Sequence, residues 1–219
     1  MSELKMGTKC VQGGYTPGNG EPRQVPIIQS TTFKYATSED MGKLFDLEAS
    51  GYFYTRLQNP TNDTVAAKIA ELEGGSAAML TSSGQAANFF AVFNIASCGD
   101  HVVASSSIYG GTFNLFNVTM RKMGIDFTFV SPDCTPEELN AAFKPNTKAV
   151  FGETIANPAL TVLDIEKFAK AAHELTSDIL SARKRAAVLN RPTVPSGTKG
   201  FVTGLSGSVQ SSRYHSSYV

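Results

Sequence analysis

Between residues 37 and 174, hydrophobic and polar positions alternate with two different periods, one typical of helices and one of strands. In the segment TNDTVAAKIAELE, for example, Val65, Ile69 and Leu72 recur at helical spacing, and Gly74 follows as a stop signal. Segments of this kind predict helices over 37–47, 61–73, 84–96, 112–124, 135–143 and 164–174. Short apolar runs predict strands over 77–83, 101–106, 126–131 and 147–153. Because strands alternate with helices, we expect parallel crossovers and a doubly wound α/β sheet.

The two ends of the chain depart from this pattern. Residues 1–60 carry turn signals such as GGYTPGNGEP and the extended segment VPIIQSTTF, so we expect an N-terminal arm ahead of an α/β domain over 61–174. From residue 175 to residue 219 serines become dense and apolar periodicity fades, which predicts a weakly ordered tail. Within it, SDILSARKRAAVL has the pattern of one helix, with Ser177 as its cap.

Composition narrows the classes of function. The 219 residues include 19 Lys and Arg against 19 Asp and Glu, so a basic nucleic-acid-binding module is not expected. The balance is uneven, because residues 175–219 hold six basic residues and one acid. No apolar run approaches the ~18 residues of a membrane span and the start does not read as a signal peptide, so we expect a soluble, cytoplasmic protein. Cys10, Cys98 and Cys134 fit neither a disulfide framework nor a metal site.

In a doubly wound sheet, ligands bind beyond the carboxyl ends of the strands, so the loops there are candidate sites. The loop TSSGQAA places Gly84 and Gln85 at the start of a helix, where free backbone N–H groups and the helix dipole favour a phosphate. A plain cap and turn explains these two residues equally well.

Two further loops carry polar or aromatic residues. In SSSIYGGT, Tyr109 could lie flat over a planar ring, although a packed core tyrosine is the better interpretation of this residue alone. In GETIANPALTVLDI, Glu153 and Asn157 follow a strand, and a simple Asn-Pro turn is about twice as good an explanation as a site.

A fourth segment, GYFYTRLQNPTN, places Tyr54 and Arg56 two residues apart. On an extended backbone these side chains share a face, so a phenol and a guanidinium could bind one anion together. The alternative is a surface salt bridge of the arginine beside a core tyrosine.

In order and spacing, these segments resemble the N-terminal half of the Cys/Met-metabolism pyridoxal-phosphate enzymes, in particular the O-acetylhomoserine sulfhydrylases. The phrases GYFYTRLQNPTN, ELEGGSAAMLTSSGQAA, SSSIYGGT and ETIANPALTVLDI carry the resemblance, which covers residues 5–174. It implies the α/β large domain of PLP-dependent transferase fold type I, aspartate-aminotransferase-like, here incomplete and preceded by an arm that crosses to a neighbouring subunit.

The resemblance also implies a role for each candidate residue. Gly84 and Gln85 would cradle the phosphate of pyridoxal 5′-phosphate, and Tyr109 would stack on its pyridine ring. Tyr54 and Arg56 would bind the phosphate of the cofactor in a partner subunit. These roles agree with the chemistry of the residue types, since amides and a guanidinium neutralise a dianion.

Asn157 would lie near the cofactor's ring oxygen, with Glu153 beside it. The family acts on small-molecule substrates and forms homo-oligomers, with homotetramers expected, whose sites are shared between subunits. By resemblance the activity is the replacement of acetate on O-acetylhomoserine by sulfide or methanethiol, giving homocysteine or methionine.

The chain departs from the family after Glu174. There the family has a strand ending in an aspartate that pairs with the pyridinium nitrogen, and later a Schiff-base lysine, and LTSDILSARKRAAVLNRP shows neither. Lys199, in the phrase Ser-Gly-Thr-Lys, is a weak candidate without the required strand context. We therefore predict no catalytic residue, a sheet with unpaired edges beyond residue 174, and poor solubility or dependence on a partner.

Two alternatives to an active sulfhydrylase stay open, and a third is set aside. The chain could be a non-catalytic truncated or frame-shifted product, or a subunit that lends Tyr54 and Arg56 to a complete partner. It could also derive from a methionine γ-lyase or a cystathionine γ-synthase, because the parts that select substrate lie mostly in the missing half. A Rossmann-type nucleotide binder is set aside, because no G-x-G-x-x-G follows the first strand.

Overall fold

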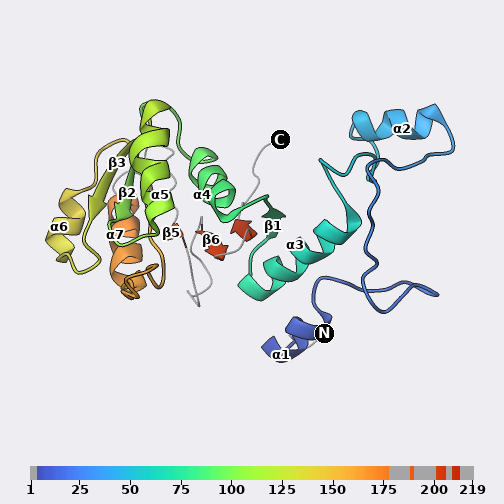
Figure 1. Cartoon of the computed structure of the whole chain (residues 1–219), viewed down its shortest axis with the longest axis horizontal. Coiled ribbons are helices and arrows are strands. Elements are labelled where there is room, and N and C mark those ends of the chain that lie inside the picture. Colours follow the sequence, from blue (N-terminus) through green and yellow to red (C-terminus); the bar gives the residue numbers. More distant parts are fainter. Residues whose placement is uncertain (1–3, 178–187, 190–200, 206–208, 213–219) are drawn as a thin grey trace. The chain divides into compact units, whose positions relative to one another are not determined.

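The described N-terminal part of the chain contains three helices and one isolated β-bridge, between Thr32 and Tyr54. The computed structural model describes residues 4–177, 188–189, 201–205 and 209–212, and it divides the chain into two compact units, Met1–Gly74 and Gly75–Val219 (Figure 1). In the first unit, α1 spans Met6–Gln12, α2 spans Ser38–Phe45 and α3 spans Pro60–Glu73. The sequence predicted α2 and α3 but not α1, because α1 is short and buries none of its residues, so it has no apolar stripe.

Asn59 holds the start of α3 against an extended segment of the first unit. Its Oδ1 accepts a hydrogen bond from the backbone N–H of Thr61 at 2.9 Å, which makes it the N-cap of α3. Its Nδ2 donates to the carbonyl oxygen of Ile28 at 3.0 Å and to Oγ1 of Thr55 at 3.1 Å. The predicted stop at Gly74 is confirmed, since this residue adopts the left-handed conformation with φ of 62°.

The second unit contains a seven-stranded sheet in the order β1-β7-β6-β5-β4-β2-β3. The strands β2 to β6 all run parallel to one another. Strand β7 is antiparallel to both of its neighbours, β6 and β1, so β1 points the same way as β2 to β6. The predicted alternation of strands and helices is confirmed. The strands are β1 Ala77–Leu80, β2 His101–Ser105, β3 Asp126–Val130, β4 Thr147–Phe151, β5 Val188–Leu189, β6 Phe201–Leu205 and β7 Val209–Ser212.

Helices cover both faces of the sheet around β2, which is buried along its whole length. Val102 packs in a core with residues of α4 and of the helix after β2, whereas Val103 packs in a second core with residues of α6 and α7. Because neighbouring residues of a strand point to opposite faces, these are the two sides of one sheet. The covering helices are α4 Gly84–Phe93, α5 Gly110–Asn114, α6 Pro136–Ala141 and α7 Ile165–Ser177.

Two of these helices show how the local sequence sets structure. The predicted capping box of α6 is present, with Glu138 N–H donating to Thr135 Oγ1 at 3.2 Å and Thr135 N–H donating to Glu138 Oε2 at 2.8 Å. The predicted helix over 112–124 changes geometry, because α5 continues as a π-helix, η1, over Leu115–Met120. Phe116 and Met120 of η1 are fully buried.

Beyond residue 174 the structure corrects two expectations. The sheet was expected to end on unpaired edges there, but β4 pairs with β5, and β1 pairs with β7 over four residues. Ladder hydrogen bonds join backbone groups, so the Ser-rich segment of β7 pairs without an apolar pattern. Ser177 was expected to cap a new helix, yet it is the last residue of α7, because that helix continues past Glu174. Residues 178–187, which hold most of that predicted helix, lie outside the described residues, and Val188–Leu189 form β5.

No helix in the described part of the chain combines the length and the apolar character that crossing a membrane requires.

Candidate functional site

Polar and aromatic residues follow three strands that end at the same edge of the sheet. Since β1, β2 and β4 point the same way, the loops after Leu80, Ser105 and Phe151 all lie at their carboxyl ends. This is the edge at which open α/β sheets bind ligands. The loops contain the predicted candidates Tyr109 and Glu153, and Gln85 lies in the first turn of α4, directly after the loop that follows β1.

The loop after β1 leads directly into α4. Ser83 caps this helix, with its Oγ accepting from the backbone N–H of Ala86 at 3.1 Å, and Thr81 Oγ1 donates to the carbonyl oxygen of Ser83 at 2.9 Å. Gly84 and Gln85 are therefore first-turn residues, and their N–H groups have no acceptor within the helix. The positive end of the helix dipole adds to the attraction for an anion at this point.

The side chain of Gln85 has an unusual environment. Its Oε1 is buried, and it has no hydrogen-bond partner among the described residues. The amide lies against Gly111, where an added Cβ would clash with Gln85 Nε2 and would lie only 2.6 Å from Cε1 of the Tyr109 ring. Glycine at this position lets the loop after β2 approach the start of α4. Close packing thus applies to Gly111 alone, because a Cβ at the neighbouring Gly110 would meet nothing within 4 Å.

Tyr109 is joined to the loop after β4. Its backbone N–H donates to Oε1 of Glu153 at 3.0 Å, and its carbonyl oxygen accepts from the N–H of Phe113 at 2.9 Å. The residue is 48% exposed, so it is not the packed core tyrosine that the sequence favoured. The contact with Glu153 was not foreseen, because it involves a backbone group and a residue in the loop after a different strand.

A side-chain hydrogen bond also joins α4 to α5 at this edge. Asn88 Nδ2 in α4 donates to Thr112 Oγ1 in α5 at 3.0 Å, and Thr112 is buried. The structure therefore joins Tyr109 to Glu153 by a hydrogen bond and places the Gln85 amide and the Tyr109 ring on the same side of Gly111.

Asn157 lies in the loop after β4, on its exposed side. The loop folds back on itself, with the N–H of Ala156 donating to Thr161 O at 2.9 Å and the N–H of Leu163 donating to Thr154 O at 3.0 Å. The turn interpretation of Asn157-Pro158 agrees with this shape, and their peptide bond is cis. Among the described residues, no hydrogen bond joins Asn157 to the other candidates.

Tyr54 and Arg56 belong to the first unit and contact one another. The guanidinium Cζ lies 5.0 Å from the centroid of the Tyr54 ring, a cation–π contact. The backbone here is a turn, with Leu57 N–H donating to Tyr54 O at 3.0 Å, so the extended geometry expected from the sequence is wrong. No salt bridge of the described residues includes Arg56, so its exposed guanidinium is available to an anion.

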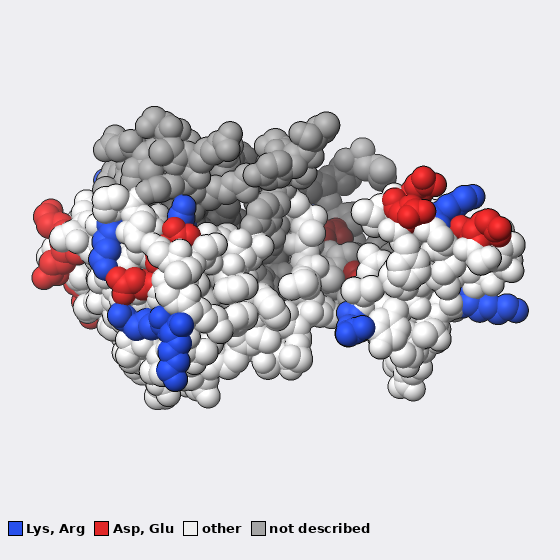
Figure 2. All heavy atoms as spheres, turned by 90° about the horizontal axis from the view of Figure 1, so that it is seen from above, with Lys and Arg blue, Asp and Glu red and all other residues white. Residues whose placement is uncertain are grey.

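The remaining candidate, Lys199, lies outside the described residues. Among the residues that the structure describes, no group of three or more His, Cys, Asp or Glu side chains could hold a metal ion. On the face drawn in Figure 2, several Lys and Arg side chains of the described residues lie beside Asp or Glu side chains.

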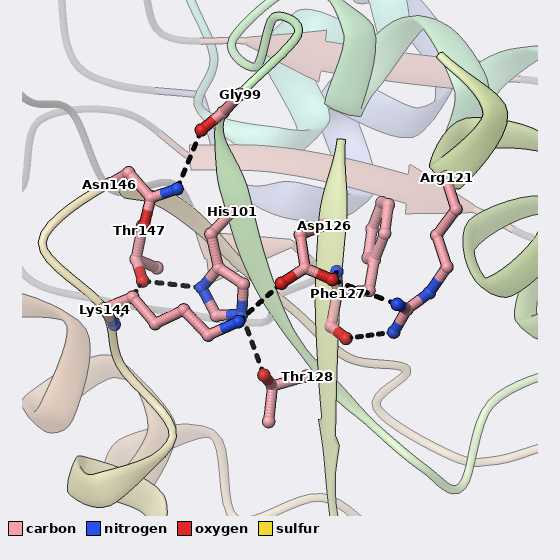
Figure 3. A network of polar contacts seen from close by, with 9 residues as sticks. All are labelled: Gly99, His101, Arg121, Asp126, Phe127, Thr128, Lys144, Asn146 and Thr147. Atoms are coloured by element: carbon pink, nitrogen blue, oxygen red, sulfur yellow. Dashed lines mark hydrogen bonds and ion pairs between the residues drawn. The ribbon is translucent and has the colours of Figure 1, made fainter. Parts of the chain in front are cut away.

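His101 lies at the opposite edge of the sheet, at the start of β2 (Figure 3). The ring is fully buried, with Nδ1 2.7 Å from Thr147 Oγ1 and Nε2 2.8 Å from Thr128 Oγ1. Nearby, Asp126 forms ion pairs with Arg121 at 3.0 Å and with Lys144 at 2.5 Å. The hydrogen bond from Lys144 is the main reason why the pKa of Asp126 is below its usual value. The surroundings of His101 support a structural role for this residue.

The comparisons with known proteins all point to one family. Residues 7–181 match the sequence profile of the Cys/Met metabolism PLP-dependent enzymes. The O-acetyl-L-homoserine sulfhydrylase of Corynebacterium glutamicum is 49% identical over 151 residues, which are 69% of this chain and 35% of that enzyme. The L-methionine gamma-lyase of Treponema denticola is 40% identical over 173 residues, 79% of this chain and 43% of that enzyme.

A solved structure agrees with the sequence relatives. A Campylobacter jejuni protein assigned as an O-acetylhomoserine (thiol)-lyase superposes with a TM-score of 0.81 at 29% identity, covering 97% of this chain and 54% of that one. It carries a pyridoxyl-lysine monophosphate group. The chain thus spans between about a third and about a half of the length of these relatives.

Proposed function

The chain belongs to the Cys/Met metabolism PLP-dependent enzyme family, and we propose that the edge formed by the ends of β1, β2 and β4 is its part of the cofactor site. Relatives of two kinds, sulfhydrylases and methionine gamma-lyases, share this N-terminal region. The observation that carries the proposal is the convergence of Gln85, Tyr109 and Glu153 from three separate strands on one edge.

The residues at this edge fit pyridoxal 5′-phosphate. The first-turn N–H groups of Gly84 and Gln85 would receive the phosphate, and the buried Oε1 of Gln85 still requires a donor. The exposed ring of Tyr109 would stack on the planar pyridine, and Asn157 would lie near the ring oxygen. When bound, the cofactor supplies an electron sink for carbanion chemistry at the substrate amino acid.

Tyr54 and Arg56 would bind the cofactor phosphate in a second copy of the chain. Their unit carries a guanidinium without an ion-pair partner among the described residues, placed over a tyrosine ring, which suits the phosphate of a cofactor in a neighbouring subunit. The proposal therefore includes a homo-oligomer with shared sites, a homotetramer by analogy with the family, in the cytoplasm.

For the intact enzyme we propose the O-acetylhomoserine sulfhydrylase reaction, in which sulfide or methanethiol replaces acetate to give homocysteine or methionine. The 49% identity to a sulfhydrylase, against 40% to a methionine gamma-lyase, supports this choice over the sibling lyases.

For this chain alone we propose no turnover. β5, the strand that follows α7, consists of Val188 and Leu189 and so lacks an acidic partner for the pyridinium nitrogen. The sequence offers no candidate other than Lys199 for the lysine that tethers the cofactor, and the sequence around Lys199 does not match the family. The alternatives are a truncated or frame-shifted product and a subunit that lends Tyr54 and Arg56 to a complete partner.

The test is to purify the chain with pyridoxal 5′-phosphate, record its visible spectrum, reduce it with borohydride, and map adducts by mass spectrometry. Equilibrium dialysis with pyridoxine 5′-phosphate, which lacks the aldehyde, measures binding that needs no lysine. We expect saturable binding of the analogue, no specific lysine adduct, and no acetate release from O-acetylhomoserine with sulfide. A specific adduct on Lys199 would show that the tail supplies a tether, and absence of analogue binding would reject the cofactor site.

A further inference from the structure

Glu153 makes a contact that the proposed cofactor contacts do not include. It lies two residues after β4, and its Oε1 accepts a hydrogen bond of 3.0 Å from the backbone N–H of Tyr109, in the loop after the neighbouring strand β2. A hydrogen bond to an ionised carboxylate is stronger than one between neutral groups. The carboxylate therefore ties the two loops together at the backbone of the aromatic residue.

The backbone that carries Glu153 is held firmly in place. Gly152 is buried, and an added Cβ there would clash with Cδ2 of Leu163, which is itself buried. The N–H of Leu163 donates to Thr154 O at 3.0 Å, which closes the loop just beyond Glu153. Glu153 thus extends from a packed strand end and a closed loop.

The ring of Tyr109, by contrast, has little packing of its own. The residue is 48% exposed, and its backbone is fixed by two hydrogen bonds, one to Glu153 and one from Phe113 at 2.9 Å. Gly111 lies against one edge of the ring and limits its movement on that side. Because the backbone sets the direction of the Cα–Cβ bond, loss of the bond to Glu153 would release the ring on the side away from Gly111.

We propose that Glu153 is a positioning residue, whose carboxylate sets the place of the Tyr109 ring at the site edge by binding the Tyr109 N–H. The inference rests on the proposed function, in which that ring stacks on the cofactor. Glu153 itself touches neither the cofactor nor the substrate in this scheme, and it acts through Tyr109.

The first measurement is amide hydrogen exchange of the full chain without cofactor, read by NMR in the wild type, Glu153→Ala and Glu153→Gln. Glutamine keeps an acceptor oxygen at the same reach, so it serves as the matched control. We expect Tyr109 N–H to exchange at least tenfold faster in Glu153→Ala and within about threefold of wild type in Glu153→Gln. The amide of Val103, in the buried centre of β2, reports whether the fold is intact.

The second measurement is the affinity of the same three proteins for pyridoxine 5′-phosphate. We expect a three- to tenfold loss for Glu153→Ala and a change of less than twofold for Glu153→Gln. Should Glu153→Ala fail to fold, Glu153→Asp replaces it, because aspartate keeps the charge but does not reach Tyr109.

The outcomes separate this inference from the proposed function. Unchanged exchange of Tyr109 in Glu153→Ala would overturn the positioning role, and so would faster exchange with unchanged affinity. If the wild type does not bind the analogue at all, the proposed function fails and the role toward the cofactor fails with it. The exchange comparison still decides in that case whether Glu153 holds Tyr109.

Discussion

The imidazole of His101 and the hydroxyl of Thr147 join the starts of two parallel strands, β2 and β4, with Nδ1 and Oγ1 2.7 Å apart. The other ring nitrogen contacts Thr128 of β3, so one buried side chain connects three strands (Figure 3). Burial lowers the pKa of His101, the charges of Lys144 and Arg121 lower it further, and Asp126 opposes them. The ring is therefore neutral in the folded protein at neutral pH.

This neutral histidine predicts a loss of stability in mild acid. In the unfolded chain a histidine titrates near pH 6.5, whereas the folded chain resists protonation of His101 at that pH. Below about pH 6.5 the unfolded state therefore binds more protons than the folded state. As the pH is lowered through this range, the free energy of unfolding decreases, by up to about 1.4 kcal/mol per pH unit. Urea unfolding followed by circular dichroism at pH 7.5, 6.5 and 5.5 measures the slope. In His101→Gln the slope should be smaller, and an equal slope in both proteins would assign the effect to other groups.

Thr147→Val should destabilise the protein more than Thr128→Val. The hydroxyl of Thr147 contacts His101 and also accepts the N–H of Lys144 at 2.8 Å, so its loss leaves two polar groups without this partner. We expect a decrease of about 1–3 kcal/mol in the free energy of unfolding, since buried polar groups without partners carry a desolvation penalty. Urea unfolding at pH 7.5 gives the comparison. If the two valine variants are equally stable, the hydrogen bond to Lys144 contributes nothing measurable.

Gly111→Ala should weaken cofactor-analogue binding with little loss of stability. The new methyl group would displace the Gln85 amide and the Tyr109 ring, which are side-chain groups able to move. We expect a stability loss of about 1 kcal/mol and roughly a tenfold loss of affinity for pyridoxine 5′-phosphate, about 1.4 kcal/mol. Gly110→Ala is the control, because a Cβ there meets nothing within 4 Å. Equal affinities of the two variants would show that the contact of Gly111 with Gln85 and Tyr109 has no bearing on the site.

In the first unit, Asn59→Ala should destabilise the protein more than Arg56→Ala. The buried side chain of Asn59 caps α3 and makes two further hydrogen bonds, so we expect a destabilisation of about 1–3 kcal/mol. Arg56 is exposed and contacts the Tyr54 ring, so Arg56→Ala should cost about 0.5 kcal/mol. Thermal unfolding of both variants tests the order. A larger effect at Arg56 would mean that this residue supports the fold and is not reserved for a ligand.

Periodic apolar patterns predicted the helices and strands up to residue 174 well. Val65, Ile69 and Leu72 marked α3, and the Thr135–Glu138 box marked the start of α6, because each signal depends on a few neighbouring residues. The pattern missed α1, which buries no side chain, and β7, whose pairing uses backbone groups that every sequence has.

The candidate site was predictable in its residues but not in its contacts. Gly84 and Tyr109 follow strands and carry recognisable chemistry, so the loops could be found. The contact between Tyr109 N–H and Glu153, and the packing of Gly111 against Gln85, join segments far apart in the chain. Such contacts depend on strand order and loop shape, which the alternation of elements leaves open.

The position of β7 between β1 and β6 affects the time at which the fold can be completed during synthesis. Among the described strands, β1 pairs with β7 alone, so residues 77–80 can pair only after residues 209–212 have been synthesised. At about 5–20 residues per second, a ribosome needs on the order of ten seconds to make the intervening chain. During that interval β1 has an unpaired edge, where a second nascent chain or a chaperone could bind before β7 is synthesised.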